Sequence, residues 1–347
     1  MFARVIGVIA TASALALPSV PAAAKPDVGI SPGDGAFQLS QQDLERELDL
    51  YASMGFRWYR IDMNWAVIER VQGEYDWSQP DRLVAAAQAR GMRVLAVPTY
   101  SPAWATRVPA ESKAPPSHLG DFTKFVAAAA GRYGPMGVRH WEVWNEPNLD
   151  DFWRPAPQPR VYARMLNKAS RAIRRADSKA KVIAGTMGPA IDLPGGTDVS
   201  PSRFTTLLYK YGAGDSFDAV SVHPSCFPAF PSSPNTEDWN AFQRLPLIHR
   251  VLARHGDAGK KVWLTEFGAP TGTSDKSLTE RGQARTYAEA IRKLKRWKWA
   301  GPLFIYSGRD RGTDPANWFD NLGFLRSDFT PKLAVSTLKR LVRPKSQ

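Results

Sequence analysis

Two glutamates that lie at the ends of short apolar segments are the first candidates for chemistry. Glu146 lies in Trp-Glu-Val-Trp-Asn-Glu-Pro-Asn (residues 141–148), and Glu266 lies in Val-Trp-Leu-Thr-Glu-Phe-Gly (residues 262–268). If both segments are parallel strands of one closed sheet, their carboxyl ends meet at one face and the two side chains can converge. Two opposed carboxylates suit hydrolysis of a glycosidic bond, because one protonates the leaving oxygen while the other attacks the anomeric carbon or activates water.

The segments that must position these glutamates recur in one rhythm along the chain. Eight short apolar or β-branched runs are predicted strands, and a helical pattern of apolar residues follows each of them. Eight βα units predict a single (β/α)8 TIM barrel over residues 25–347, in which functional residues lie at the carboxyl ends of the strands. The predicted strands are Asp27–Ser31, Phe56–Asp62, Met92–Pro98, His140–Trp144, Lys181–Gly185, Phe217–Val222, Lys261–Thr265 and Pro302–Ser307.

A doubly wound open sheet is the alternative to the barrel. Such a sheet normally carries a glycine-rich phosphate turn after its first strand, and residues 29–35 do not match Gly-x-Gly-x-x-Gly. Apolar residues spaced three or four positions apart, such as Leu44, Leu48 and Tyr51, predict the buried helix faces. Ser-Leu-Thr-Glu at residues 277–280 predicts a capping box that opens the seventh helix.

The chain offers few residues for metal or redox chemistry. Cys226 is the single cysteine, which excludes an intramolecular disulfide and a cysteine-based metal site, and we expect this thiol to be inert. The five histidines form no His-x-His or His-Glu-x-x-His pair. We therefore expect a reaction carried by two carboxylates, with no metal and no organic cofactor.

The N-terminus has the pattern of an export signal. Arg4 precedes an uncharged apolar run over residues 5–17, Pro18 ends the run, and alanines at 22–24 form a small-residue cleavage site. Residues 1–24 are therefore predicted to be a cleavable signal peptide, and the protein to be secreted, periplasmic or associated with the cell envelope. An uncleaved membrane anchor is the alternative, although the run is shorter than the ~20 apolar residues of a comfortable span.

The chain is basic, with 46 lysines and arginines against 33 aspartates and glutamates, and a formal net charge of +13. Such a surface is attracted to anionic partners. A basic stretch over residues 292–298 lies off the expected apolar face of its helix, so we interpret it as solvated or drawn to an anionic cell envelope. The sequence carries no signature of a nucleic-acid-binding module. We expect a monomer with a carbohydrate substrate, no nucleic-acid partner and no stable membrane insertion.

The two glutamate motifs resemble those of the clan A glycoside hydrolases, among which the cellulase-like families 5 and 39 are most similar. The resemblance extends over almost all of the chain beyond residue 24 and includes segments expected after the second, sixth and eighth strands. These segments are Trp65–Glu69 with Gly73–Trp77 and Asp81, Ser221–Pro224, and Asn321–Leu325 before Pro331 and Lys332.

The resemblance implies roles for four residues. Glu146 matches the acid/base of the clan and Glu266 its nucleophile, which implies retention of anomeric configuration through a covalent glycosyl–enzyme intermediate. Asn145 matches the asparagine that hydrogen-bonds the sugar 2-hydroxyl. Arg60 matches an arginine beside the nucleophile, and a guanidinium within ~4–6 Å is expected to lower the pKa of Glu266 and keep it ionised. The alternative for Arg60 is a buried barrel arginine paired with Asp62 or Glu142.

Two positions depart from the pattern of family 5. The family usually carries His-x-Tyr after strand six, with the tyrosine supporting the nucleophile, whereas this chain has His223, Pro224 and Ser225. His223 is a candidate sugar contact, with a satisfied loop histidine as the alternative. The family often carries a tryptophan after strand eight, and Tyr306 takes roughly that place. Trp104 is expected either to stack on a sugar ring or to pack within the fold.

The sequence thus predicts an exported retaining glycosidase that cleaves a β-linked glycan, either a pyranoside or a furanoside. The basic surface favours a cell-envelope polysaccharide over plant biomass as substrate. Two alternatives stay open, namely a transglycosylase that shares the covalent intermediate and a non-hydrolytic barrel that binds polysaccharide in the same cleft. Intact Glu146 and Glu266 favour the enzyme, because a binding protein needs no matched carboxylates.

Overall fold

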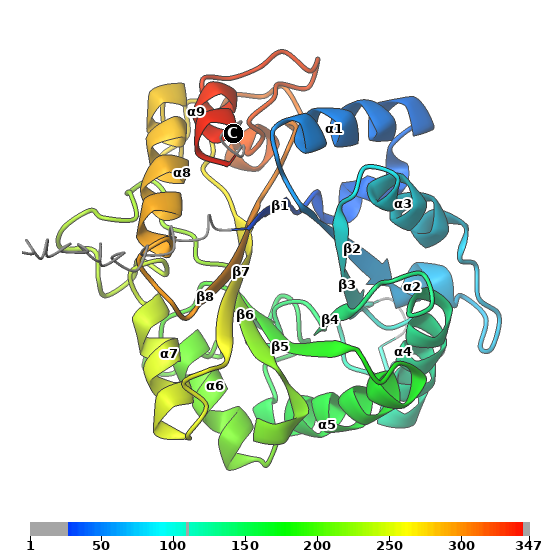
Figure 1. Cartoon of the computed structure of the whole chain (residues 1–347). Helices are drawn as coiled ribbons and strands as arrows, with labels where there is room; N and C mark the ends of the chain where they lie inside the picture. Colours follow the sequence, from blue (N-terminus) through cyan, green and yellow to red (C-terminus); the bar gives the residue numbers. More distant parts are fainter. Residues whose placement is uncertain (1–26, 109–110, 343–347) are drawn as a thin grey trace, which may run out of the picture.

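Eight parallel strands close into a barrel in the computed structural model, which describes residues 27–108 and 111–342 (Figure 1). Each strand pairs with the next along the chain, and β8 pairs with β1. The eight predicted strands are all present, which confirms the (β/α)8 architecture and excludes the open sheet. The strands are β1 (Val28–Ile30), β2 (Trp58–Asn64), β3 (Arg93–Thr99), β4 (His140–Val143), β5 (Lys181–Met187), β6 (Ala219–Val222), β7 (Lys261–Phe267) and β8 (Ala300–Ile305).

Helices form a ring around the strands, as Figure 1 shows. The first of them, α1 (Gln41–Ser53), buries Leu44, Leu48 and Tyr51 on one face, as their spacing predicts. The same amphipathic arrangement recurs around the ring and closes the core between helices and sheet. The other helices are α2 (Trp65–Ile68), α3 (Ser78–Gln88), α4 (Leu119–Tyr133), α5 (Pro159–Ala176), α6 (Pro201–Lys210), α7 (Leu245–Arg254), α8 (Glu280–Leu294) and α9 (Ala334–Val342), with short 3-10 turns at Gly33–Gln38, Gly214–Ser216 and Trp318–Asn321.

The start of α8 differs from the predicted capping box. Thr279 is the N-cap residue, and its Oγ1 accepts a hydrogen bond from the backbone N–H of Gly282 at 3.1 Å. The Ser277 hydroxyl instead contacts Ser274 Oγ at 2.8 Å and the Thr271 carbonyl oxygen at 3.3 Å. The predicted box was wrong because the serine belongs to the loop before the helix, which leaves the cap to the next hydroxyl residue.

The interior of the barrel changes from apolar to polar along the strands. Near the amino-terminal ends, Trp58, Trp263 and Phe304 belong to a buried apolar cluster that fills the barrel. Side chains alternate along a strand, so Trp58, Arg60 and Asp62 of β2 share the inner face. Arg60 therefore packs on the carboxyl-terminal side of the apolar cluster. Asp62, two residues further along β2, lies closer to the carboxyl-terminal mouth of the barrel.

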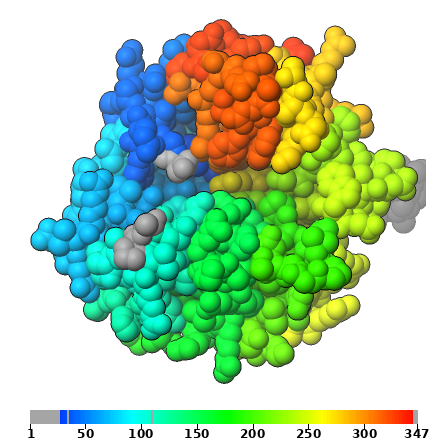
Figure 2. Space-filling model, turned by 180° about the vertical axis from the view of Figure 1, so that it is seen from behind, coloured from blue at the N-terminus to red at the C-terminus, as the bar shows by residue number. Residues whose placement is uncertain are grey.

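The long segments that follow β3, β6 and β8 gather at this mouth. Figure 2 shows this face hollowed between the orange segment after β8 and the cyan and green segments after β3 and β4. The predicted signal peptide at residues 1–24 lies outside the described residues. Across residues 27–108 and 111–342, no helix is long and apolar enough to cross a membrane.

Candidate active site

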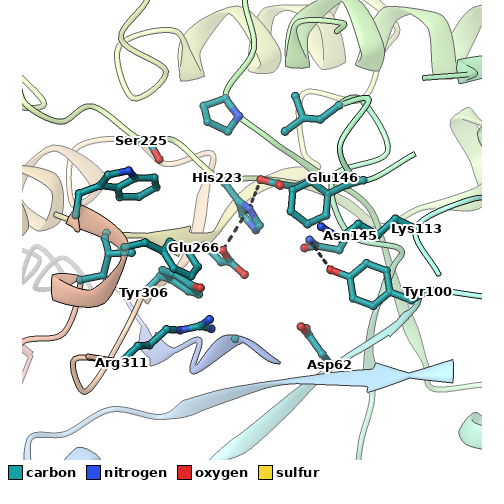
Figure 3. A pocket seen from close by; sticks show the side chains of 18 of the residues that line it. Asp62, Tyr100, Lys113, Asn145, Glu146, His223, Ser225, Glu266, Tyr306 and Arg311 are labelled. Atoms are coloured by element: carbon teal, nitrogen blue, oxygen red, sulfur yellow. Dashed lines mark hydrogen bonds and ion pairs between the residues drawn. The ribbon is translucent and has the colours of Figure 1, made fainter. Parts of the chain in front are cut away.

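A cavity of about 700 Å³ opens at the carboxyl-terminal face of the barrel. Figure 3 shows it from close by, with Glu146, Glu266, Asn145, His223 and Tyr306 among the residues that line it. These are five of the seven residues that the sequence proposed for the site. The two motifs that are distant in sequence therefore meet in one cavity.

The loop after β4 presents Glu146 through an unusual backbone path. Trp144 and Glu146 have φ angles of 71° and 47°, in the left-handed region, which for residues other than glycine costs of order 1–3 kcal/mol each. The Trp144 indole is buried, stands edge-on to Trp153 at 5.4 Å, and donates from Nε1 to the Phe152 carbonyl at 3.0 Å. These contacts offset the cost and hold the turn that points Glu146 into the cavity.

Asn148 clamps this loop to the segment after β5. Its side-chain amide donates to the Gly188 carbonyl at 3.0 Å and to the Val199 carbonyl at 2.8 Å, and its Oδ1 accepts from the Gly188 N–H at 2.7 Å. Gly188 also gives the glutamate room, because a Cβ there would lie 2.8 Å from Glu146 Oε1. These hydrogen bonds use only the backbone of position 188 and need no side chain there.

Glu266 owes its direction to an irregularity in β7. Trp263 belongs to the cluster inside the barrel, so strict alternation would turn Glu266 away from the axis. Between Leu264 and Phe267, however, β7 advances three residues while β8 advances two, from Leu303 to Ile305. An extra residue of this kind re-aims the side chains beyond it. Glu266 consequently faces the cavity.

Arg60 connects the two motifs from below. Its guanidinium donates from Nη1 to Glu266 Oε1 at 2.7 Å, from Nε to Glu142 Oε2 at 2.8 Å and from Nη2 to Asn145 Oδ1 at 2.9 Å. Nη1 also lies 3.2 Å from Asp62 Oδ1. Arg60 thus makes the expected contact with the candidate nucleophile and also the structural ion pairs that were its alternative. The contacts of both interpretations are therefore present together.

Arg60 lowers the pKa of Glu266, as predicted, but it does not outweigh the burial of the carboxylate. Burial raises the pKa of Glu266, and the attraction of His223 and Arg60, which lowers it, does not compensate, so the pKa lies above its usual value. The prediction of a lowered pKa was wrong because it counted the guanidinium and not the desolvation. The pKa of Glu142 is lowered, because Arg60, Ser221 and His223 together outweigh the effect of its burial.

His223 lies between the two candidate catalytic carboxylates. Its Nδ1 is 2.8 Å from Glu146 Oε1 and 3.5 Å from Glu266 Oε2, and Figure 3 shows both contacts. Burial lowers the pKa of His223, but the two carboxylates outweigh it and raise the pKa above its usual value. His223 is therefore held by Glu146 and Glu266 at the cavity, and its contact with a sugar stays a prediction.

Three residues that the sequence analysis did not single out also belong to this site. Asp62 lines the cavity, and Tyr100 lines it while its hydroxyl accepts a hydrogen bond from Asn145 Nδ2 at 3.3 Å. The Ser31 hydroxyl donates to Glu266 Oε1 at 3.4 Å, so a serine after β1 contacts the carboxylate that a tyrosine supports in the family pattern. Each of these residues lies at or just beyond the carboxyl half of a predicted strand. Their place in the predicted barrel could therefore have identified them as site residues.

The two aromatic candidates have different surroundings. Tyr306 lines the cavity after β8. Trp104 is not among the residues that line it. Its indole stands edge-on to Trp65 at 5.5 Å and donates from Nε1 to the Glu69 carbonyl at 2.8 Å. The structure therefore favours packing over sugar stacking for Trp104.

Metal ligation and thiol chemistry find no support in the described part of the chain. Among those residues, no three histidine, cysteine, aspartate or glutamate side chains form a group that could hold a metal ion. Cys226 is a buried free thiol, and burial raises its pKa. The thiol therefore stays protonated and unreactive near neutral pH.

A closed eight-stranded parallel barrel with two glutamates converging after β4 and β7 defines a class, the clan A glycoside hydrolases. A family model narrows the class, since the model of the cellulases (glycosyl hydrolase family 5) matches residues 35–301. The chain belongs to glycosyl hydrolase family 5. Proteins that it resembles are named β-xylosidase.

Solved structures share the fold at low sequence identity. A family 39 glycoside hydrolase from Bacteroides cellulosilyticus WH2 superposes with a TM-score of 0.72 and 22% identity, over 92% of this chain and 64% of that one. A family 5 subfamily 18 enzyme from Streptomyces cattleya, solved in complex with GlcNAc, gives a TM-score of 0.71 and 17% identity, over 94% and 82% of the two chains. These likenesses confirm the expected similarity to families 5 and 39 at the level of the fold.

Curated relatives match over a shorter stretch. A β-xylosidase of Caldicellulosiruptor saccharolyticus is 34% identical over 109 residues, which is 31% of this chain and 20% of that protein. A β-xylosidase of Geobacillus stearothermophilus is 36% identical over 90 residues, or 24% and 16% of the two chains. The chain therefore spans a fifth or less of the length of these relatives.

Proposed function

We propose that the protein hydrolyses a β-linked glycan with retention of anomeric configuration, Glu266 acting as nucleophile and Glu146 as acid/base. The observation that carries the proposal is the contact of one nitrogen, His223 Nδ1, with both carboxylates at 2.8 and 3.5 Å. The two oxygens can be no further apart than the sum of these distances. This limit applies to one oxygen of each carboxylate, and it is compatible with the ~5–5.5 Å separation of a retaining pair.

The two steps follow from this geometry. In the first step, an oxygen of Glu266 attacks the anomeric carbon while Glu146 gives its proton to the departing glycosidic oxygen, so the aglycone leaves as an alcohol. In the second step, Glu146 takes a proton from water, whose oxygen attacks the same carbon and releases Glu266 as a carboxylate. Arg60 and Ser31 contact Oε1 of Glu266, and Oε2 faces His223.

Asn145 supports both steps by orienting the sugar. Its Oδ1 accepts from Arg60 Nη2 and its Nδ2 donates to the Tyr100 hydroxyl, so both ends of the amide are held. The amide is consequently positioned before substrate arrives, and its position beside Glu146 suits a hydrogen bond to the sugar 2-hydroxyl. Such bonds strengthen in the transition state of glycoside hydrolysis.

We further propose that the protein is exported and acts on a glycan of the cell envelope. The apolar run at residues 5–17 with alanines at 22–24 and the net charge of +13 support export and attraction to an anionic envelope. Mass spectrometry of the protein recovered from its own cells tests the export step. A mature chain that begins at Lys25 and is found outside the cytoplasm is expected, and an intact chain in the cytoplasm would contradict it.

The reaction is tested with a panel of 4-nitrophenyl β-glycosides, pyranosides and furanosides alike. The panel includes β-xylosides and β-mannosides, because proteins similar to this chain are named β-xylosidase and exo-β-1,4-mannosidase. Glu266→Gln is expected to abolish activity, and Glu146→Gln to impair it mainly on substrates with poor leaving groups. Glu45→Gln on the exposed face of α1 is the matched control and keeps full activity. Equal rates in the wild type and both site variants would refute the assignment.

Analysis of the products tests the stereochemical course of the reaction and the two alternative functions, a transglycosylase and a non-hydrolytic binding barrel. Proton NMR of the first product distinguishes retention, in which the β-anomer appears first, from inversion. Added acceptor sugar that captures most of the glycosyl group identifies a transglycosylase. Binding of envelope polysaccharide without any cleavage product, by wild type and Glu266→Gln alike, identifies a non-hydrolytic barrel and would overturn the proposed reaction.

A further inference from the structure

The charged residues that line the cavity separate into two groups. The carboxylates of Asp62, Glu146 and Glu266 all lie within contact distance of Arg60 or His223. The other charged lining residues are cations, and they come from segments after β3, β7 and β8, namely Lys113, Lys276 and Arg311. The carboxylates therefore have Arg60 or His223 as partners within the site, whereas the cations come from the segments that surround the cavity.

These cations stand on aromatic rings of the same cavity. Lys276 Nζ lies 4.8 Å from the centre of the Trp318 ring, and Arg311 Cζ lies 4.8 Å from that of Phe319. The two rings are themselves 5.5 Å apart, so the four residues form one continuous strip, which we call the basic-aromatic strip. An aromatic face attracts a cation without neutralising its charge. Each cation is thereby held at the wall of the cavity.

Lys113 provides the positive charge on another side of the cavity. Its Nζ lies 4.0 Å from the centre of the Phe152 ring, which also lines the cavity. Figure 3 shows Lys113 and Arg311 on opposite sides of the catalytic carboxylates. Across the described ranges, no carboxylate forms an ion pair with Lys113 or Lys276. A ligand that passes over Glu146 and Glu266 therefore meets cations on both sides.

Arg311 is held at this place by a backbone feature. Gly33 has a φ of 70°, and a Cβ there would lie 2.5 Å from Arg311 Nη2 and 2.9 Å from Tyr306 Cε2. Only a residue without a side chain allows the segment after β1 to come this close to both groups. The Arg311 guanidinium therefore lies beside Tyr306, at the floor of the cavity, rather than extending freely into solvent.

We propose that the natural substrate is an anionic glycan, whose acidic groups are bound by the basic-aromatic strip and by Lys113. This proposal rests on the proposed function, because it concerns the substrate of the same cavity. Neutral sugars stack on aromatic rings and accept hydrogen bonds from ammonium and guanidinium groups, but they bring no opposite charge. A carboxylate or an ester of phosphate or sulfate accepts charge-assisted hydrogen bonds from them. The acidic group is either the carboxylate of a uronate or an ester of phosphate or sulfate. The ligands of the binding experiment distinguish these two groups.

Binding to an inactive variant tests the proposal without depending on catalysis. The ligands are β-1,4-linked oligomannuronate, the same oligosaccharide after reduction of its carboxylates to alcohols, and a 6-phosphorylated β-1,4-linked oligomannoside, titrated calorimetrically into Glu266→Gln and Glu146→Gln. At least one acidic ligand is expected to bind about tenfold or more tightly than the reduced one, with an affinity that falls as salt rises. A preference for the oligomannuronate identifies a uronate, and one for the phosphorylated ligand identifies an ester.

Charge-removing variants assign the effect to the cavity. Arg311→Gln and Lys113→Gln, each in the Glu266→Gln background, are expected to weaken binding of the preferred acidic ligand about tenfold and to leave the reduced ligand unaffected. Arg292→Gln on the outer face of α8 makes the same charge change away from the cavity and is the matched control. An effect of equal size in Arg292→Gln would attribute binding to net charge and overturn the proposal.

The two proposals fail in different ways. Equal affinity for acidic and reduced ligands, or no measurable affinity for either acidic ligand, overturns the anionic substrate even if aryl glycosides are hydrolysed. Selective binding of an acidic ligand by a protein that hydrolyses no glycoside overturns the proposed reaction and retains the anionic ligand. Binding is measured on Glu266→Gln and Glu146→Gln, and turnover is measured on the wild type.

Discussion

Arg60 donates a hydrogen bond to Glu266 at 2.7 Å across 206 positions of the chain. The same guanidinium reaches Glu142 and Asn145 at 2.8 and 2.9 Å, so one buried side chain connects β2, β4 and β7. A planar fork with several N–H groups can make these bonds at once, whereas a lysine ammonium is a single point charge. The geometry of both catalytic motifs therefore depends on an arginine at position 60.

Arg60→Lys is expected to keep the fold and lose most of the activity. The ammonium preserves one positive charge beside Glu142, but it cannot hold Glu266 and Asn145 in their present positions, and a misplacement of about 1 Å costs about 100-fold in rate. We expect kcat/KM to fall by about 100-fold on every substrate that the wild type hydrolyses.

Arg60→Met separates the structural role of this arginine from its catalytic role. Without a cation the buried Glu142 is left unpaired, which costs about 3–5 kcal/mol in free energy of unfolding, measured by urea denaturation. Arg60→Lys is expected to lose less stability than Arg60→Met. Wild-type activity in Arg60→Lys would show that the planar guanidinium with its several N–H donors is not required at position 60.

The sequence predicts the barrel well because its signals are local and repeated. Strands such as Lys181–Met187 are apolar runs between helical patterns, and their order alone places the segments around Glu146 and Glu266 at one face. The irregularity in β7 was not predictable, because a register shift depends on how two strands pair and not on the residues of one. It is this shift that turns Glu266 toward Arg60.

Two other features of the site, the pKa of Glu266 and the packing of Trp104, depend on contacts between residues that are distant in the sequence. The pKa of Glu266 reflects burial against attraction to Arg60 and His223, and burial at that position exists only after the barrel has closed. Trp104 offers an aromatic ring after β3, but the neighbouring Trp65 and the Glu69 carbonyl hold it away from the cavity. Residue type alone could not distinguish packing from sugar stacking.

His223→Gln is expected to move the acid limb of the kcat/KM profile to higher pH. Glu266, the proposed nucleophile, must be ionised to react, so its raised pKa places that limb above the usual range of a glutamate. His223, whose own pKa is raised by the two carboxylates, favours the ionised form of Glu266. Removing this positive charge raises the pKa of Glu266 further, so the limb shifts upward by about one pH unit.

His140→Gln is the matched control for this shift. Burial lowers the pKa of His140 to about 4, so this histidine is neutral in the range where the limb is measured. The ring packs between Trp58 and Trp263 at the amino-terminal end of the barrel, and its replacement lowers stability without moving the limb. A limb that stays in place or moves to lower pH in His223→Gln would contradict the proposed attraction.

Gly188→Ala is expected to lower activity by displacing Glu146. The new methyl would lie 2.4 Å from Leu149 Cδ1 and 2.8 Å from Glu146 Oε1, so the acid/base must move. We expect kcat/KM to fall about tenfold to 100-fold on substrates with poor leaving groups, and less on 4-nitrophenyl glycosides, which need little protonation.

Gly131→Ala makes the same substitution where nothing lies within 4 Å, inside α4. It is expected to keep full activity and to gain about 0.5–1 kcal/mol in stability, because alanine is the better helix former. A drop in activity of equal size on good and poor leaving groups in Gly188→Ala would point to a general distortion rather than to the acid/base.

Lys332→Met is expected to destabilise the segment that carries Tyr306 and Arg311. Lys332 Nζ is buried, donates to Asp310 and to Thr271 Oγ1, each at 2.8 Å, and so ties the segments after β7 and β8 together. Its loss leaves Asp310 buried without its cation, at a cost of about 3–5 kcal/mol in free energy of unfolding. Adding Asp310→Leu is expected to recover part of the loss, but not all, because the Gly323 N–H then loses its acceptor.

The deficit of Lys332→Met is also expected to depend on pH. Burial already raises the pKa of Asp310, and removal of the ammonium raises it further, so the folded state of the variant binds a proton more tightly than the unfolded state. A raised pKa in the folded state stabilises at low pH and is lost as pH rises. The stability difference from wild type should therefore grow in urea titrations as the pH rises from about 4, the ordinary pKa of an aspartate, toward neutrality. A deficit that is constant over this range, or that shrinks, would show that Asp310 does not carry an uncompensated charge when Lys332 is absent.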